Sequence, residues 1–273
     1  AELAERGFTE FPPCLYNSKQ SVLIEDIHRA FMDAGAELLQ SNTEHANRLT
    51  LERYGFADKV YELNRTGVWI ARYAAQRRAY VAGVVGPVGK FLTPLGALNR
   101  DDVREAFVQQ ITALADGGAD VLMLKSFIDI EELELAIDAA KFVAPDMPII
   151  AQKTFPEDGA VLATSFPADV AQRLVSKGVN VIGTNGTVGP QRMMDILKHF
   201  RANGTPLCSQ PDVGIPTLVD GKAIFNAEPH YVAQAVKRLV EAGAQIVGCE
   251  GGCTVAHTRA IAEALSDAVI GSH

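Results

Sequence analysis

Gln245-Ile-Val-Gly-Cys-Glu-Gly-Gly-Cys-Thr-Val-Ala-His257 contains the pattern that the rest of the chain repeats. A short apolar run predicts a buried strand, the glycines predict a tight turn, and residues 254–268 have the periodicity of a helix. The first amide hydrogens of such a helix point back at the turn and favour a bound anion there. Cys249 and Cys253 flank the turn, and thiolates are both soft metal ligands and nucleophiles. This stretch therefore predicts a strand–helix unit and a place for chemistry.

The same unit recurs along the chain. Apolar runs that end in polar or glycine residues predict strands at 37–42, 80–85, 120–124, 147–152, 179–183, 206–209 and 245–248. Helical periodicity is found at 21–34, 57–78, 99–117, 130–142, 168–176, 190–200, 229–242 and 254–268. The strands are apolar on both faces, as in a parallel sheet that helices cover.

Eight helices and seven strands favour a (β/α)8 TIM barrel whose first strand is absent or hidden in the N-terminal segment. We expect a single domain over residues 1–273, because no linker interrupts the pattern. A doubly wound sheet is the alternative, but no Gly-x-Gly-x-x-Gly motif follows a first strand.

The composition is that of an ordinary globular protein, with 48% hydrophobic and 21% charged residues. A net charge of -8 without a basic face argues against a nucleic-acid partner. No apolar stretch approaches the roughly 20 residues that span a bilayer, and no secretory signal is seen, so we expect no membrane partner. The 4 cysteines are few and unevenly placed, which favours reduced thiols and a cytoplasmic location. Assembly into a homo-oligomer is compatible with the sequence.

Polar residues stand where the predicted strands end. In a barrel these ends meet on the face that carries the active site. The residues that we expect to bind substrate are Asn42, Glu44, Gln152, Asn185 and Gln210. Lys125 and Glu250 are the candidates for catalysis.

Three cysteines at strand ends, Cys208, Cys249 and Cys253, are the predicted metal ligands. A catalytic zinc takes three protein ligands and keeps a fourth position open. Bound zinc would hold a thiol substrate as the nucleophilic thiolate at neutral pH. The alternative is that each cysteine packs as a small buried hydrophobe, which is our interpretation of Cys14.

Two lysines at strand ends, Lys125 and Lys153, allow a different chemistry. A desolvated lysine can form a Schiff base or bind an anionic group, and the plainer alternative is a side chain that reaches out to solvent. His257 follows Cys253 by one helical turn and is expected to cap the helix or support the site.

Segments along nearly the whole chain share residues with one known family. They are Ile27-His-Arg-Ala30, Ser41-Asn-Thr43, Val85-Gly-Pro-Val-Gly89, Pro148-Ile-Ile-Ala-Gln152, Thr184-Asn185, Gln210-Pro211 and His257-Thr-Arg-Ala-Ile261. On these residues the chain resembles the homocysteine S-methyltransferase domain family, and in particular the bacterial kind fused to a methylenetetrahydrofolate reductase. The resemblance implies a TIM barrel, one-carbon transfer, a small-molecule substrate and zinc. By likeness to barrels that serve a corrinoid protein, it also implies a corrinoid or folate on a partner protein.

The site residues depart from that family's pattern. Lys125 stands where the family has a glutamate for the substrate ammonium, and Gly186 stands where it has its first zinc cysteine. Glu250 and Gly251 replace the family's Cys-Cys pair. We interpret the cysteines nearby as a rebuilt metal site, and Lys125 as the partner of an anionic substrate group.

The hypothesis is therefore a methyltransferase of this superfamily that moves a methyl group from a small donor to a thiol or corrinoid acceptor. The alternatives are a true homocysteine S-methyltransferase, a Schiff-base lyase that uses Lys125 or Lys153, and a degenerate barrel without catalysis.

Overall fold

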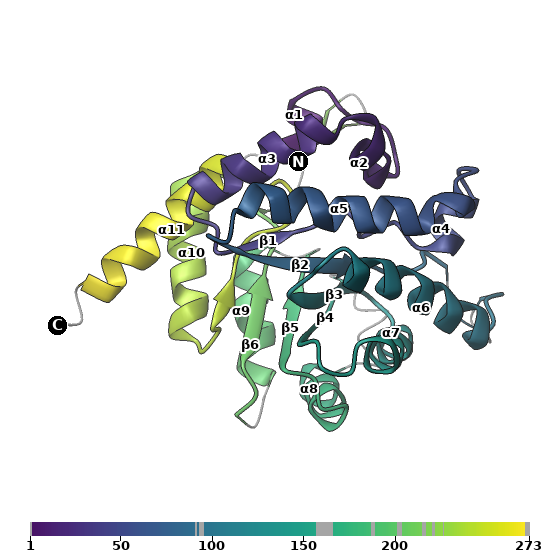
Figure 1. The fold of residues 1–273 in the computed structure, drawn as a ribbon. Coiled ribbons are helices and arrows are strands. Elements are labelled where there is room, and N and C mark those ends of the chain that lie inside the picture. Colours follow the sequence, from purple (N-terminus) through teal and green to yellow (C-terminus); the bar gives the residue numbers. More distant parts are fainter. Residues whose placement is uncertain are drawn as a thin grey trace.

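Seven parallel strands form the main sheet, in the order β1-β2-β3-β4-β5-β6-β9 (Figure 1). The computed structural model describes residues 2–90, 92, 96–156, 166–186, 189–200, 204–214, 217–219, 222–225 and 227–270. The strands of this sheet are β1 Leu38–Gln40, β2 Tyr80–Val85, β3 Val121–Phe127, β4 Ile149–Lys153, β5 Val181–Asn185, β6 Leu207–Gln210 and β9 Ile246–Val247. A separate antiparallel hairpin consists of β7 Thr217–Val219 and β8 Lys222–Ile224.

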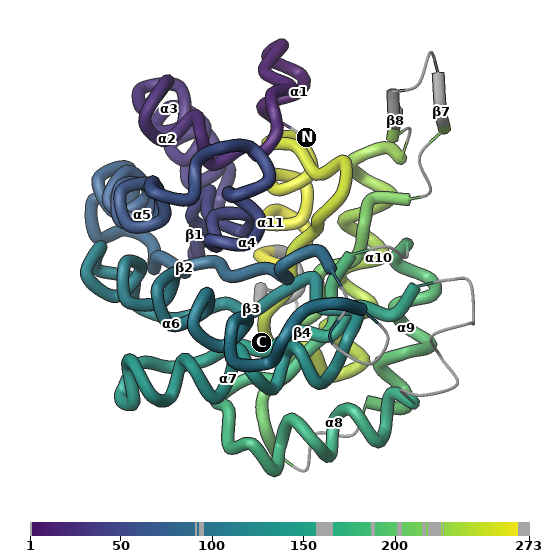
Figure 2. Tube along the Cα trace, turned by 90° about the vertical axis from the view of Figure 1, so that its right-hand side faces the viewer, coloured from purple at the N-terminus to yellow at the C-terminus, as the bar shows by residue number. Residues whose placement is uncertain are grey.

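Helices surround the strands, and Figure 2 shows them arranged in a ring. The helices that follow strands are α4 Arg48–Glu52, α5 Val60–Ala75, α6 Arg100–Asp116, α7 Ile130–Val143, α8 Pro167–Ser176, α9 Pro190–His199, α10 Pro229–Glu241 and α11 Val255–Ile270. Before β1 lie α1 Glu2–Glu5, the 3-10 turn Pro13–Leu15, α2 Tyr16–Lys19 and α3 Ser21–Asp33, and a second 3-10 turn, Ala57–Lys59, precedes α5. Among the described residues, no helix has the length and apolar character needed to traverse a bilayer.

Local signals in the sequence set the helix starts. The Asn99 side chain accepts a hydrogen bond from the Asp101 amide at 2.9 Å and so caps the start of α6. Asp129 caps α7 in the same way through the Glu131 amide at 2.8 Å. Helices α8, α9 and α10 each carry a proline in the first turn, where the missing amide hydrogen costs nothing.

Alternation along the strands separates two cores. One face of the sheet packs against the helices in a large apolar cluster that includes Leu122 and Phe127 of β3. The other face turns inward, where a smaller cluster gathers buried side chains from β2, β3, β4 and β6. Its fully or nearly buried members are Ala82, Val84, Met123, Ile150 and Cys208. The chain therefore fills the inside of a curved sheet as barrels do.

The sheet is open between β1 and β9. These strands are its two ends, and no pairing joins them in the described part of the chain. The predicted parallel barrel is confirmed with seven strands, and the residues described before α3 form helices and turns instead of an eighth strand. The predicted helix at 57–78 stops at Ala75, because Gln76 adopts a left-handed conformation with φ of 47°.

Gly183 of β5 provides a test of how closely the strands pack. A Cβ atom at this position would lie 2.1 Å from the main-chain oxygen of Cys208, which cannot rotate away. We expect Gly183→Ala to cost about 3 kcal/mol of unfolding free energy, as overpacking does. At Gly83 a Cβ atom would lie 3.1 Å from the Cβ atoms of Ala119 and Leu114, which requires a shift of only a few tenths of an ångström, so Gly83→Ala should cost about 1 kcal/mol. Urea unfolding of both variants measures the difference, and equal losses would contradict this packing.

Glu132 of α7 makes stability depend on pH. Burial raises the pKa of its carboxyl from 4.5 to about 7, against the hydrogen bond that the carboxyl accepts from the Val88 amide at 2.7 Å. A carboxyl whose pKa is higher in the folded state loses stability as pH rises from the unfolded pKa through the folded one. We expect unfolding free energy to fall by about 2–3 kcal/mol between pH 4.5 and 7.5. In Glu132→Gln that loss should disappear, whereas in the exposed neighbour variant Glu131→Gln it should persist.

Candidate functional site

The site lies at the carboxyl ends of the strands, one layer above the inner apolar cluster. Inward positions alternate, so that Lys125 follows Met123 on β3 and Gln210 follows Cys208 on β6. The inside of the barrel thus changes from apolar to polar along its axis. This change places the predicted site residues of different strands in one layer.

Lys125 is the centre of that layer. Its Nζ donates to the two carboxylate oxygens of Glu250 at 2.6 and 2.7 Å and to Gln40 Oε1 at 3.0 Å. A Glu44 oxygen lies 3.6 Å away. Burial acts to lower the pKa of Lys125, but the charges of Glu250 and Glu44 outweigh it and raise that pKa. The lysine is therefore protonated at neutral pH.

The interpretation of Lys125 as the partner of an anionic substrate group is thus corrected. Its charge is taken up by Glu250, a residue of the same chain, because the turn after β9 reaches over β3. Two carboxylates face one ammonium, which leaves a net charge of -1 at the mouth of the barrel. Glu44 is the more accessible of the two carboxylates, with 28% of its side chain exposed against 17% for Glu250.

The two carboxyl groups differ in their surroundings. Burial raises the pKa of Glu250, and the attraction of Lys125 offsets only part of that effect. Burial acts in the same direction on Glu44, but the charges of Lys125 and His45 together with hydrogen bonds lower its pKa. Glu44 is therefore the carboxylate that stays charged most readily and is free to meet a cation.

A bulge in β3 brings Ser126 into the site. The pairing of β3 with β4 shifts between Leu124 and Phe127, and Ser126 has a φ of 68°, which is unusual for a residue with a side chain. Asn185 fixes this conformation, since its Oδ1 accepts from the Ser126 amide at 2.9 Å and its Nδ2 donates to the Ser126 hydroxyl at 3.1 Å. Asn185 therefore supports the site from β5 through Ser126.

The glycine-rich turn after β9 is held by hydrogen bonds and by a disulfide. Asp212 Oδ1 accepts from the Gly251 amide at 2.7 Å. Cys249 and Cys253 form a disulfide bond, with Cα atoms 5.5 Å apart. The expectation of reduced thiols is wrong for this pair, because the turn brings two cysteines within bonding distance. His257 Nδ1 lies 2.9 Å from the Thr254 hydroxyl at the start of α11, as expected for a capping residue.

The three predicted metal ligands do not meet. Cys208 belongs to the inner cluster, whereas Cys249 and Cys253 pack against the outer one. The reason is alternation: Cys208 pairs with Ile246, and Cys249 is an odd number of positions further on. Burial also raises the pKa of the Cys208 thiol far above its usual value, so this thiol stays protonated.

The residues present do not fit a three-thiolate zinc site. A disulfide sulfur is not a thiolate ligand, and the third cysteine lies on the opposite face of the sheet. Across the described residues, no group of three or more His, Cys, Asp or Glu side chains is arranged to hold a metal ion.

The predicted amide residues have two different roles. Asn42 donates to Pro13 O at 2.8 Å and to Asn17 Oδ1 at 3.0 Å, so it anchors the N-terminal segment. Gln152 donates to Cys208 Sγ at 3.3 Å. Its Oε1 and that of Gln210 are buried and have no hydrogen-bond partner among the described residues. Gln210 also lines the cavity described below, so its oxygen is available to a ligand, whereas Gln152 is fully buried.

Lys153 is not part of the mouth. It pairs with Thr184, on the face that turns to the helices, and its Nζ donates to Thr154 O at 2.8 Å. The Nζ also lies 4.5 Å from the centroid of the Phe155 ring. Burial lowers the pKa of Lys153 to about 8. The expected position of this lysine at the site was wrong, because the strand continues one residue past Gln152.

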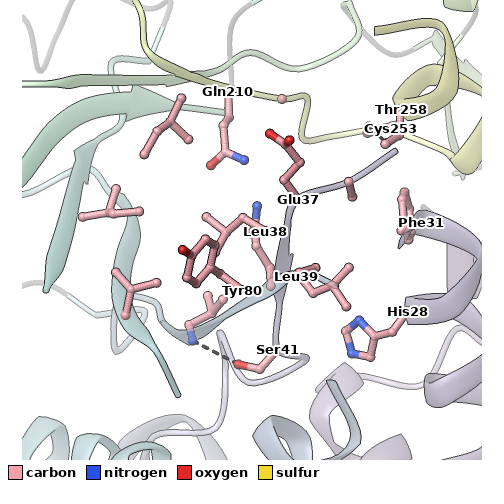
Figure 3. Close-up of a pocket in the computed structure, with 18 of the residues that line it drawn as sticks. His28, Phe31, Glu37, Leu38, Leu39, Ser41, Tyr80, Gln210, Cys253 and Thr258 are labelled. Atoms are coloured by element: carbon pink, nitrogen blue, oxygen red, sulfur yellow. Dashed lines mark hydrogen bonds between the residues drawn. The ribbon is translucent and has the colours of Figure 1, made fainter. Parts of the chain in front are cut away.

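A cavity of about 1530 Å³ connects the mouth with the open side of the barrel. In Figure 3, His28 and Phe31 of α3 lie on one side of this space and Gln210 lies on the other. The cavity also reaches Glu44, Lys125 and Glu250. The ion cluster is therefore accessible to a small molecule.

Sequence reasoning missed Gln40 and Ser126. Gln40 accepts a hydrogen bond from Lys125, and Ser126 carries the bulge. Gln40 could have been found from alternation, since it is the first polar residue after Leu38 on the inward face. Nothing in the sequence signals the left-handed conformation of Ser126.

Comparison with known proteins supports the fold described above and identifies the family of the chain. The sequence profile described as homocysteine S-methyltransferase matches residues 3–265. Methionine synthase of Mycobacterium leprae is 29% identical in an alignment of 280 positions that covers 97% of this chain and 23% of that protein. Methionine synthase of Mycobacterium tuberculosis is 29% identical in an alignment of 281 positions that covers 98% of this chain and 24% of that protein. The chain thus spans about a quarter of the length of these relatives.

A solved structure shows the same fold. The metallated form of the homocysteine methyltransferase MmuM from Escherichia coli superposes with a TM-score of 0.77 at 20% identity, covering 96% of this chain and 92% of that one. Its oxidised form gives a TM-score of 0.76 at 19% identity, covering 97% and 92%. Because the family profile covers almost every residue of these strands and helices, this chain belongs to the homocysteine S-methyltransferase family.

Proposed function

We propose that this chain is a methyltransferase module that transfers a methyl group to the sulfur of a small thiol amino acid of the homocysteine type. The observation that carries the proposal is the ion cluster of Lys125, Glu250 and Glu44, whose net charge is -1. Family membership supports the reaction class. In such a transfer the acceptor sulfur loses its proton and forms the new S–C bond while the bond between methyl group and donor breaks.

The cluster suits a substrate that carries an ammonium group. An amino acid is a zwitterion, and its ammonium group can pair with the excess carboxylate of the mouth, whereas a purely anionic ligand would only add to the negative charge there. Glu44 can receive the ammonium because it is partly exposed and lies 1.0 Å further from Lys125 than Glu250 does (3.6 against 2.6 Å). Gln210 Oε1, which has no partner among the described residues, can accept a further hydrogen.

The proposal defines the methyl acceptor more closely than the methyl donor. It is a small donor molecule, or a corrinoid or folate on a partner protein, as the family resemblance implies. The large cavity leaves room for a donor beside the acceptor. Lys125, Glu250 and Glu44 therefore act here as binding and orienting groups for the acceptor.

Schiff-base chemistry has less support. Lys125 is held in its protonated form by two carboxylates, and a protonated amine is not a nucleophile. Lys153 faces the helices. A barrel without catalysis is distinguished from the proposal by the binding measurements below, because it requires no ammonium site.

The charge of Glu44 can be tested directly. We expect Glu44→Gln to weaken homocysteine binding about 5–30-fold, since removing a partly exposed carboxylate beside an ammonium costs about 1–2 kcal/mol. Isothermal titration calorimetry measures the change. The same variant should bind 4-mercaptobutanoate, which lacks the ammonium, at least as tightly as the unchanged protein does, because the mouth has lost a negative charge.

Glu52→Gln serves as the matched control, because Glu52 is exposed on α4 and lies outside the cluster. Its homocysteine affinity should be unchanged. The proposed ammonium site is ruled out when a folded Glu44→Gln variant binds homocysteine as tightly as the unchanged protein.

A rebuilt metal site is the second part of the proposal, and it is limited to the reduced chain. Two cysteines separated by three residues have the spacing of a zinc-binding pair once they are thiols. We expect zinc uptake, measured by elemental analysis after dialysis, to be negligible for the oxidised protein and to appear after reduction. Cys249→Ser should abolish the uptake, and Cys208→Ser should leave it unchanged. Loss of uptake in Cys208→Ser would contradict the separation of the cysteines onto two faces.

A further inference from the structure

The loop that carries Glu44, between β1 and α4, is held by side chains from other elements. Three of its main-chain oxygens accept hydrogen bonds from fully buried amide side chains, each on a different helix. The donors are Asn17 of α2 to Asn42 O at 2.9 Å, Gln110 of α6 to Thr43 O at 2.8 Å, and Asn64 of α5 to Ala46 O at 2.8 Å. The helices α5 and α6 lie side by side (Figure 2). The course of this loop is therefore determined by residues outside it.

Gln110 acts on the peptide group next to Glu44. The carbonyl of Thr43 and the amide of Glu44 belong to one planar group, so a hydrogen bond to Thr43 O holds the plane on the amino side of Glu44. The Gly86 amide holds the plane on the other side, because it donates to Glu44 O at 3.0 Å. Two planes meet at the Cα atom of Glu44 and set the direction in which its side chain leaves the main chain.

The orientation of the Gln110 amide follows from its neighbours. Its Nε2 lies 2.8 Å from Thr43 O and 3.2 Å from Asn64 Oδ1. Both neighbours are acceptors, since Asn64 uses its Nδ2 to donate to Ala46 O and Val60 O. The amino end of the Gln110 side chain must therefore face the loop.

The stability of the fold does not by itself explain a glutamine at this position. Gln110 makes two hydrogen bonds, but its buried Oε1 has no partner among the described residues, so the net contribution to folding is small. The carbonyl that it binds is satisfied without it, because Thr43 O also accepts from the Ala46 amide at 2.9 Å. What Gln110 adds is a connection between this turn and α6.

Glu44 is sensitive to the direction of its main chain. Its carboxylate lies 3.6 Å from Lys125 Nζ at the cavity, whereas Gln110 is fully buried and does not line the cavity. The main chain of Gly86 packs closely against the Glu44 side chain, since a Cβ atom at Gly86 would lie 2.5 Å from Glu44 Cγ. The side chain therefore has little freedom to compensate for a rotation of the peptide before it.

We propose that Gln110 is a positioning residue of the site. Through its hydrogen bond to Thr43 O it directs Glu44 toward the ammonium group of the acceptor, without touching the ligand itself. The inference rests on the proposed function, because it concerns the same ammonium site. Gln110 thus contributes to the preference for an amino acid over a thiol that lacks the ammonium, and not to the affinity for ligands in general.

The variant Gln110→Met tests this role, because methionine has a similar length but cannot donate to Thr43 O. We expect the affinity for homocysteine, measured by isothermal titration calorimetry, to fall about fivefold, at the lower end of the coupling between separate groups. The affinity for 4-mercaptobutanoate should not change. In a Glu44→Gln background Gln110→Met should have no further effect, because the carboxylate that Gln110 directs is absent.

Gln109→Met is the matched control. Gln109 is the half-buried neighbour of Gln110 on α6, and its amide donates to Glu105 of the same helix. This variant should leave both affinities unchanged. An equal loss for both ligands in Gln110→Met, or the same loss in the Glu44→Gln background, would indicate a general structural role and overturn the proposal. A folded Gln110→Met variant with unchanged homocysteine affinity would overturn it as well.

A measurement on the unchanged protein decides the question where Gln110→Met does not fold. Coupling between groups is reciprocal, so saturating homocysteine should slow hydrogen exchange of the Gln110 side-chain amide by the same factor of about five. The analogue 4-mercaptobutanoate should not slow it, and the Gln109 side-chain amide should exchange equally with either ligand. Equal exchange of the Gln110 amide with both ligands contradicts the proposal.

The ammonium site and the role of Gln110 can fail separately. If Glu44→Gln leaves homocysteine binding unchanged, the ammonium site itself is wrong, and the role of Gln110 is wrong with it. If Glu44→Gln weakens homocysteine binding and Gln110→Met does not, the ammonium site stands and only the role of Gln110 is wrong.

Discussion

The ion pair between Lys125 and Glu250 is the interaction on which the site depends. Each group is expensive to bury alone, and at 2.6 Å each makes the burial of the other tolerable. The pair joins β3 to the turn after β9, two elements on opposite sides of the inner layer. The protonated lysine therefore holds the side chain of Glu250 in the mouth, while hydrogen bonds and the disulfide hold the turn that carries it.

Glu44 changes the net charge that a ligand meets at this ion pair. A lysine opposite one carboxylate makes a neutral site, and a second carboxylate gives the site a preference for cations. When the chain is compared with the family one position at a time, Lys125 is a positive charge where the resemblance implies a negative one. In three dimensions the positive charge of Lys125 is compensated by Glu250, a residue 125 positions further along the chain.

The arrangement of strands and helices could be predicted from the sequence because each signal is local. Apolar runs, caps such as Asn99, and the prolines at helix starts depend on a few neighbouring residues. The rule that strand ends gather also placed Lys125, Glu250 and Glu44 together correctly. The predicted cysteine metal site was wrong, because a position at a strand end does not specify which face of the sheet a side chain lies on. Cys208 and Cys249 lie on opposite faces. The left-handed conformation of Ser126 could not be predicted from its neighbours in the sequence, because it depends on Asn185, 59 residues away.

The open side of the barrel and the ion cluster are parts of the same geometry. Gln40 is the last residue of one edge strand and Glu44 follows it, and Glu250 follows the other edge strand, so three of the groups around Lys125 lie beside the opening. In a closed barrel each strand end is held by a neighbour on both sides. Here β1 and β9 have a neighbour on one side only, and the buried lysine supplies a link between them. Lys125 therefore has a structural role as well as an electrostatic one. It contacts Gln40 of β1 and Glu250 after β9, and so connects two strands that are not paired with each other by main-chain hydrogen bonds among the described residues.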